Sequence, residues 1–106
     1  MLIYKIKNNI NEKVYIGQTV KKMETRWEEH KRNLNYRNNG NEKFKRSKLY
    51  SSMNKYGIEN FSIEIIEFVD TREKMDEREI FWINFYDSFN KGLNLTLGGE
   101  SGCLGY

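Results

Sequence analysis

The chain has 106 residues, of which 38% are hydrophobic and 14% aromatic, and its formal net charge is +3. These values fit one globular domain and exclude a disordered chain, and no apolar run approaches the roughly 18 residues of a membrane-spanning helix. A single cysteine and a single histidine exclude an internal disulfide and argue against a structural zinc site. The N-terminus lacks a signal-peptide pattern, because Lys5 and Lys7 interrupt its apolar residues, so we expect an intracellular, cytoplasmic protein.

The first predicted element is a hairpin. Residues 2–7 alternate in the manner of a strand, an asparagine-rich turn follows, and residues 14–18 resume as a second short strand. Together they predict an antiparallel pair.

A helix is predicted next, over about residues 21–36. Met23, Trp27 and Leu34 recur there at spacings of four and seven and form one apolar face. Thr19 is a plausible N-cap for this helix.

The middle of the chain predicts a loop, a helix and a strand. Residues 37–44 are polar and read as the loop. Ser47 is suited to cap a second helix that ends at Gly57. Residues 61–69 are strand-like and apolar enough to predict a central strand.

The last predicted helix covers about residues 72–87, after Thr71, and a short extended piece follows it. The resulting order, β-β-α-α-β-α, predicts an α+β fold with a small three-stranded antiparallel sheet flanked by helices. We expect one domain over residues 1–97 and a glycine-rich tail or linker over 98–106.

Charge is unevenly distributed along the chain. Residues 31–55 contain eight basic residues and one acidic residue, a balance of +7, whereas residues 59–87 contain nine acidic and three basic residues, a balance of −6. One interpretation is a basic face that binds a polyanion. The other is two solvated faces of opposite sign.

Glu79 falls on an apolar helix face, since Met75 precedes it by four residues and Ile83 follows it by four. A carboxylate there is costly unless it is paired, protonated or bound to a metal. One interpretation is a salt bridge to a neighbouring element, for example to Arg26. The other is a ligand for Mg²⁺, which carboxylates in clefts usually bind.

Arg26 and His30 are neighbours at i and i+4 on the first helix. An arginine beside the chain's one histidine could bind a phosphate and assist proton transfer. The alternative is an exposed pair in which His30 packs partly against Trp27.

Tyr4 and Tyr15 lie in the two strands of the hairpin. Tyrosine is a common strand residue, so core packing is one interpretation. Gly17 follows Tyr15 on the same strand face, and a glycine inside a strand often marks close approach by a ligand or another backbone. Asn94 by itself indicates only a turn.

Together, these segments resemble the GIY-YIG nuclease superfamily, and most closely the catalytic domains of phage and intron homing endonucleases. The resemblance covers roughly residues 2–97. The matching segments are LIY (2–4), YIG (15–17), RWEEH (26–30), NKYGIENF (54–61), EIFWI (79–83) and GLN (92–94).

The resemblance implies hydrolysis of DNA phosphodiesters with one divalent metal ion, Mg²⁺ or Mn²⁺, and no small-molecule cofactor. Glu79 would hold the metal, and Arg26 would bind the phosphate and the charge that develops on it. Tyr4 would position or deprotonate the attacking water, while Tyr15 and His30 would orient water and assist proton transfer.

The resemblance also implies residues that bind the substrate. Asn94 would anchor the DNA backbone, and Gly17 would leave room for it. Some homing members carry a second histidine where this chain has Phe44, Lys45 and Arg46, which shifts the expected phosphate contacts to Lys45, Arg46 and Lys48. Leu2 replaces the first glycine of the family motif.

Three hypotheses follow. The first is a metal-dependent DNA endonuclease, either the catalytic domain of a longer protein with a C-terminal DNA-recognition region or a small stand-alone nuclease. The second is a nucleic-acid-binding module on the same scaffold with little cleavage of its own. The third, disfavoured by the ordered motif matches, is a protein-interaction domain. Only the first explains a carboxylate on an apolar stripe.

Overall fold

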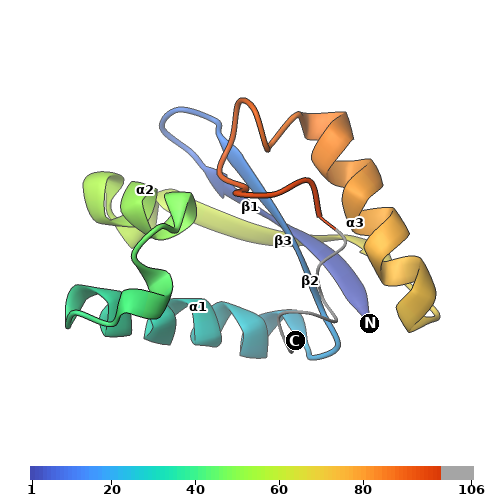
Figure 1. Ribbon diagram of the computed structural model, residues 1–106, viewed down its shortest axis with the longest axis horizontal. Coiled ribbons are helices and arrows are strands. Elements are labelled where there is room, and N and C mark those ends of the chain that lie inside the picture. Colours follow the sequence, from blue (N-terminus) through green and yellow to red (C-terminus); the bar gives the residue numbers. More distant parts are fainter. Residues whose placement is uncertain (99–106) are drawn as a thin grey trace.

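The computed structural model describes residues 1–98 and contains one antiparallel sheet (Figure 1). Its strands are β1 (Leu2–Asn8), β2 (Val14–Thr19) and β3 (Phe61–Phe68), in the order β2-β1-β3. The predicted hairpin and the predicted three-stranded sheet are therefore confirmed.

Three α-helices accompany the sheet: α1 (Met23–Asn38), α2 (Lys48–Tyr56) and α3 (Arg72–Tyr86). The predicted loop between α1 and α2 contains a short 3₁₀ helix, η1 (Glu42–Phe44), and a second one, η2 (Ile58–Asn60), leads into β3. The predicted α+β fold and order of elements are confirmed. Within residues 1–98, no helix is both long and apolar enough to cross a membrane.

The predicted N-cap and C-cap of α2 are present, and Thr71, predicted to precede α3, is its N-cap. The side chains of Ser47 and Thr71 each accept a hydrogen bond from the backbone N–H three residues later. Gly57 ends α2 with a φ of 87°, a conformation that favours glycine.

The predicted N-cap at Thr19 is wrong. Strand β2 continues to Thr19, and Lys22 occupies the N-cap position of α1 without a side-chain hydrogen bond. The Thr19 hydroxyl instead accepts a hydrogen bond from the backbone N–H of Lys21, at 3.0 Å, and so stabilises the turn between the two elements.

The predicted central position of β3 is also wrong, because β1 lies between the other two strands. The apolar run of β3 has a different cause. Ile63 and Ile65 pack against the core on one side of the sheet, and Ile66 packs against the core on the other side. A strand at an edge can thus be covered on both faces.

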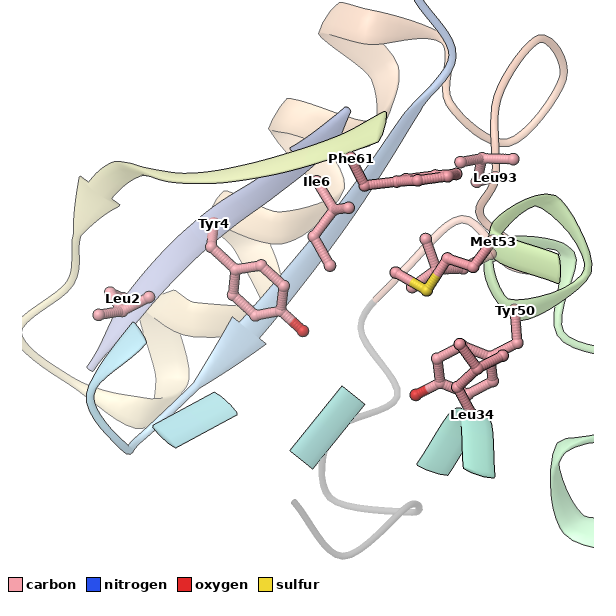
Figure 2. Packing of buried hydrophobic residues seen from close by; sticks show 9 residues of the cluster. Leu2, Tyr4, Ile6, Leu34, Tyr50, Met53, Phe61 and Leu93 are labelled. Carbon is pink, nitrogen blue, oxygen red and sulfur yellow. The ribbon is translucent and has the colours of Figure 1, made fainter. Parts of the chain in front are cut away.

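The sheet separates two hydrophobic cores. Helices α1 and α2 cover one face and α3 covers the other (Figure 1). The α1/α2 core, drawn in Figure 2, consists of Leu2, Tyr4, Ile6, Leu34, Leu49, Tyr50, Met53, Phe61 and Leu93. The α3 core consists of Ile3, Ile16, Val69, Met75 and Ile83.

After α3 the chain returns to the outer edge of β2. Asp87, with a φ of 51°, ends the helix, and the backbone N–H of Leu93 donates to the carbonyl of Val14 at 2.9 Å. The predicted extended piece is therefore present as a tether to β2 and not as a strand. Of the predicted tail, all but Gly98 lies outside the described residues.

Candidate active site

A cleft of about 550 Å³ lies along the outer edge of β2. Because β2 ends the sheet on this side, helices from both faces reach the cleft, together with residues 93–96. The predicted site residues that line it are Tyr15, Arg26, His30, Arg46, Glu79 and Asn94. The fold thus brings together residues that are far apart in the sequence.

Tyr4 lies beneath this cleft and is 0% exposed. Its ring belongs to the α1/α2 core (Figure 2), and its hydroxyl lies 2.7 Å from Nε2 of His30 and accepts a hydrogen bond from Nε of Arg26 at 3.2 Å. The core-packing interpretation of this tyrosine is therefore confirmed. It is a core residue that also positions site residues, and its burial removes it from the direct contact with water that was expected.

Gly17 faces Tyr4 directly across the β1–β2 ladder. A Cβ atom at position 17 would collide with the ring of Tyr4. The close approach expected at this glycine is present, and the group that approaches is the ring of Tyr4.

Arg26 is held in place by oxygen atoms. Its Nη1 lies 3.2 Å from Oε1 of Glu29, and the other carboxylate oxygen of Glu29 pairs with Nζ of Lys21. Burial favours the neutral form of Arg26, but its neighbours Tyr4 and Tyr15, with the hydrogen bonds to Tyr4 and Glu29, outweigh burial and raise its pKa above the ordinary value. The cleft therefore keeps a fixed positive charge.

His30 is buried between two tyrosines, 2.7 Å from the hydroxyl of Tyr4 through Nε2 and 2.7 Å from that of Tyr50 through Nδ1. Burial, with the charge of Arg26, lowers the pKa of His30 to about 3. The imidazole is thus neutral at pH 7. The alternative of an exposed Arg26–His30 pair is wrong, because α1 turns His30 toward the sheet.

Tyr15 is partly exposed and lines the cleft directly. Its ring stands edge-on to that of His30, with 5.8 Å between centroids, and 6.2 Å from that of Tyr4. Of the two motif tyrosines, Tyr15 is the one with access to a bound molecule.

Glu79 is 7% exposed and lies between the buried residues Met75 and Ile83 on α3, as predicted. Its carboxylate lines the cleft. Within residues 1–98, no group of three His, Cys, Asp or Glu side chains could enclose a metal ion. One carboxylate suits Mg²⁺, which is commonly held by one or two carboxylates, waters and substrate phosphates, and does not suit a structural zinc ion.

Asn94 fixes the edge of β2. Its Oδ1 accepts from the backbone N–H of Ile16 at 2.8 Å and from the hydroxyl of Ser88 at 2.7 Å, and its Nδ2 donates to the carbonyl of Ile16 at 2.9 Å. The geometry therefore gives this amide a structural role beside the cleft, where a substrate contact was expected.

The predicted phosphate-binding residues separate into two groups. Arg46 lines the cleft and is joined there by Lys43. Lys45 lies 3.7 Å from Glu42 on the surface, and Lys48 donates to the carbonyl of Phe89 at 3.4 Å. Neither Lys45 nor Lys48 lines the cleft.

Three site residues escaped the sequence reasoning: Glu29, Asn33 and Tyr50. Glu29 and Asn33 each follow a predicted site residue by three positions on α1, a spacing that places side chains on one helix face. The helical spacing could therefore have identified Glu29 and Asn33. No sequence pattern pointed to Tyr50, because it lies on the apolar face of α2 and was interpreted as a core residue.

Comparisons with known proteins identify the family of the chain. Residues 1–94 match the model of the GIY-YIG catalytic domain. The segB protein of Enterobacteria phage T4 is 40% identical over 104 residues, and Intron-associated endonuclease 1 of the same phage is 38% identical over 97 residues. The matches cover 93% and 89% of this chain but only 39% and 36% of those proteins.

A solved structure shares the fold of this chain. The catalytic domain of the homing endonuclease I-TevI superposes with a TM-score of 0.73 at 35% sequence identity, over 89% of this chain and 96% of that one. The chain therefore belongs to the GIY-YIG family, and its fold is that of the I-TevI catalytic domain.

Proposed function

We propose that this protein is a divalent-metal-dependent DNA endonuclease that hydrolyses phosphodiester bonds. The observation that carries the proposal is the pairing, in one cleft, of a fixed cation with a buried carboxylate on the opposite wall, Arg26 on α1 and Glu79 on α3. A protein that only bound DNA would gain nothing from a carboxylate facing a polyanion. The family match and the two phage relatives support the same reaction class.

Each residue has a role in this proposal. Arg26 donates hydrogen bonds to the scissile phosphate and to the charge that develops on it, and its attachment to Tyr4 and Glu29 fixes its direction in advance. Glu79 holds a Mg²⁺ or Mn²⁺ ion. When bound, such an ion stabilises negative charge on the phosphate and on the leaving oxygen.

Tyr15 and His30 complete the wall opposite the metal ligand. Tyr15, which reaches the cleft, orients the attacking water. His30 is neutral and hydrogen-bonded on both ring nitrogens, so it acts by orienting Tyr4 and not by storing a proton. Lys43 and Arg46 at the mouth of the cleft contact the neighbouring phosphates.

The test is a plasmid-nicking assay with and without Mg²⁺ or Mn²⁺. We expect cleavage only with metal, and Glu79→Gln should abolish cleavage while DNA binding is retained. Glu77→Gln is the matched control, because Glu77 is exposed on the same helix and lines no part of the cleft. If the wild-type protein binds DNA and cuts none with any divalent metal, the protein is a binding module.

A further inference from the structure

A continuous line of side-chain contacts crosses the interior beneath the cleft. It starts at Arg26, whose Nε donates to Tyr4, and passes from the Tyr4 hydroxyl to Nε2 of His30 over 2.7 Å. From Nδ1 of His30 it continues over 2.7 Å to the hydroxyl of Tyr50, which also accepts from Nδ2 of Asn33 at 3.2 Å. In Figure 2 the hydroxyl groups of Tyr4 and Tyr50 point into the space between them.

The protons in this line have two possible arrangements. A neutral imidazole has one N–H donor and one bare nitrogen acceptor. In the first arrangement Nδ1–H donates to Tyr50 and Nε2 accepts from Tyr4. In the second, Tyr50 donates to Nδ1 and Nε2–H donates to Tyr4. Both tyrosine oxygens already receive one N–H, so the number of donors alone does not decide between them.

The two residues at the ends of this line, Arg26 and Asn33, differ in charge, and this difference favours the first arrangement. Arg26 is a cation, so its N–H withdraws electron density from the Tyr4 oxygen and makes that hydroxyl the stronger donor. Asn33 is neutral and leaves the Tyr50 oxygen the better acceptor.

We propose that Tyr50 is a positioning residue that accepts the Nδ1–H of His30 and thereby fixes the tautomer whose Nε2 accepts the hydrogen bond from Tyr4. The bond made by one ring nitrogen sets the protonation of the other. With this tautomer the Tyr4 hydrogen points toward His30, and the Tyr4 oxygen keeps its lone pairs directed to Arg26. Asn33 in turn orients Tyr50.

The effect of Tyr50 on cleavage rests on the proposed function, but its effect on His30 does not. The chain contains one histidine, so the ¹⁵N signals of the imidazole in a tag-free protein belong to that residue alone. At pH 7 we expect Nδ1 to carry the proton and Nε2 to be bare. The reverse tautomer in the wild-type protein would overturn the proposal without any variant.

The Tyr50→Phe variant supplies the second measurement, since it removes only the hydroxyl. We expect the His30 signals to move toward the Nε2–H form or an average of the two tautomers, and kcat to fall about tenfold or more with KM little changed. Tyr56→Phe is the matched control, because Tyr56 lies partly buried on the same helix against the same core. It should leave both the His30 signals and kcat unchanged.

The two readouts separate this proposal from the proposed function. A Tyr50→Phe protein that keeps the wild-type His30 signals contradicts the positioning role, whatever its rate. A wild-type protein that cuts no DNA contradicts the nuclease proposal, and its ¹⁵N spectrum still decides the role of Tyr50.

Discussion

The two edges of the sheet are both rich in charged side chains, but they are built differently. On the β3 side, Lys5 pairs with Glu64 at 2.7 Å, and Glu67 accepts hydrogen bonds from Arg78 and Trp82. On the β2 side, helices from both faces of the sheet enclose a cleft that holds Arg26 and Glu79. The first edge carries pairs of charged side chains, and the second encloses the candidate active site.

The difference between the two edges lies in the burial of their charged groups. At the β3 edge each charge has a nearby partner and water on one side, an arrangement that contributes little free energy. At the β2 edge, burial and the nearby charge of Arg26 lower the pKa of His30 to about 3. The Glu79 carboxylate is also buried there, between apolar residues of α3. Burial next to a cleft, and not the number of charges, distinguishes the two edges.

The largest expected effect compares two arginines. Arg26→Ala should lower the rate of DNA cleavage about 10²- to 10³-fold, or about 3–4 kcal/mol, because one charged contact to the transition state is lost. Arg78→Ala, which removes an arginine from the β3 edge, should leave the rate unchanged. Single-turnover cleavage assays measure both. Equal cleavage rates for the two variants would contradict a role for Arg26 in the reaction.

The next effect compares two asparagines in the segment that follows α3. Asn94→Ala should lower the free energy of unfolding by about 2–3 kcal/mol, because the buried N–H and carbonyl of Ile16 lose their partners. Asn90→Ala removes only an exposed bond to Asp87 and should change stability by less than about 0.5 kcal/mol. Chemical denaturation of both variants is the measurement. A stable Asn94→Ala protein would favour the substrate role first expected for this residue.

A third effect depends on pH. Above about pH 6.5 His30 is neutral in the folded and the unfolded chain, but below it the unfolded chain binds a proton that the folded protein rejects until about pH 3. The free energy of unfolding should therefore fall by about 2 kcal/mol between pH 6.5 and pH 5. A His30→Gln variant should lack this slope, while the titration of carboxylates is common to both proteins. Parallel stability curves would contradict the burial of His30.

The smallest effect belongs to the β3 edge. Glu64→Ala breaks the pair with Lys5, whose pKa is raised mainly by its hydrogen bond to Glu64 against the opposing effect of burial. Glu64 is 60% exposed, so we expect a loss of less than about 1 kcal/mol and no change in cleavage. A loss above about 2 kcal/mol would mean that this edge also depends on a buried charge.

Much of the site could be predicted from the sequence, because its parts are local. The spacing of Arg26 and His30, and the apolar neighbours of Glu79, are properties of single helices, and the structure confirms that Glu79 is buried on the apolar face of its helix. The hairpin and two of the helix caps are also local and were correct.

The errors arise where the structure depends on distant segments. The apolar run of β3 reports burial of its two faces and carries no information on its hydrogen-bond neighbours, so its place in the sheet was wrong. Asn94 was interpreted as a turn residue, because only the fold brings it to its hydrogen-bond partners Ile16 and Ser88. Tyr50 read as core because its hydroxyl meets His30 only when α2 packs beside α1.

The tether at the outer edge of β2 has a consequence for the protein in concentrated solution. A sheet edge with open N–H and carbonyl groups invites a strand from another molecule. Here the carbonyl of Val14 and both backbone groups of Ile16 are already bonded to Leu93 and Asn94. These bonds occupy backbone groups that a strand from a second copy would need, so strand addition along this part of β2 is hindered, while the cleft beside it stays accessible to a ligand.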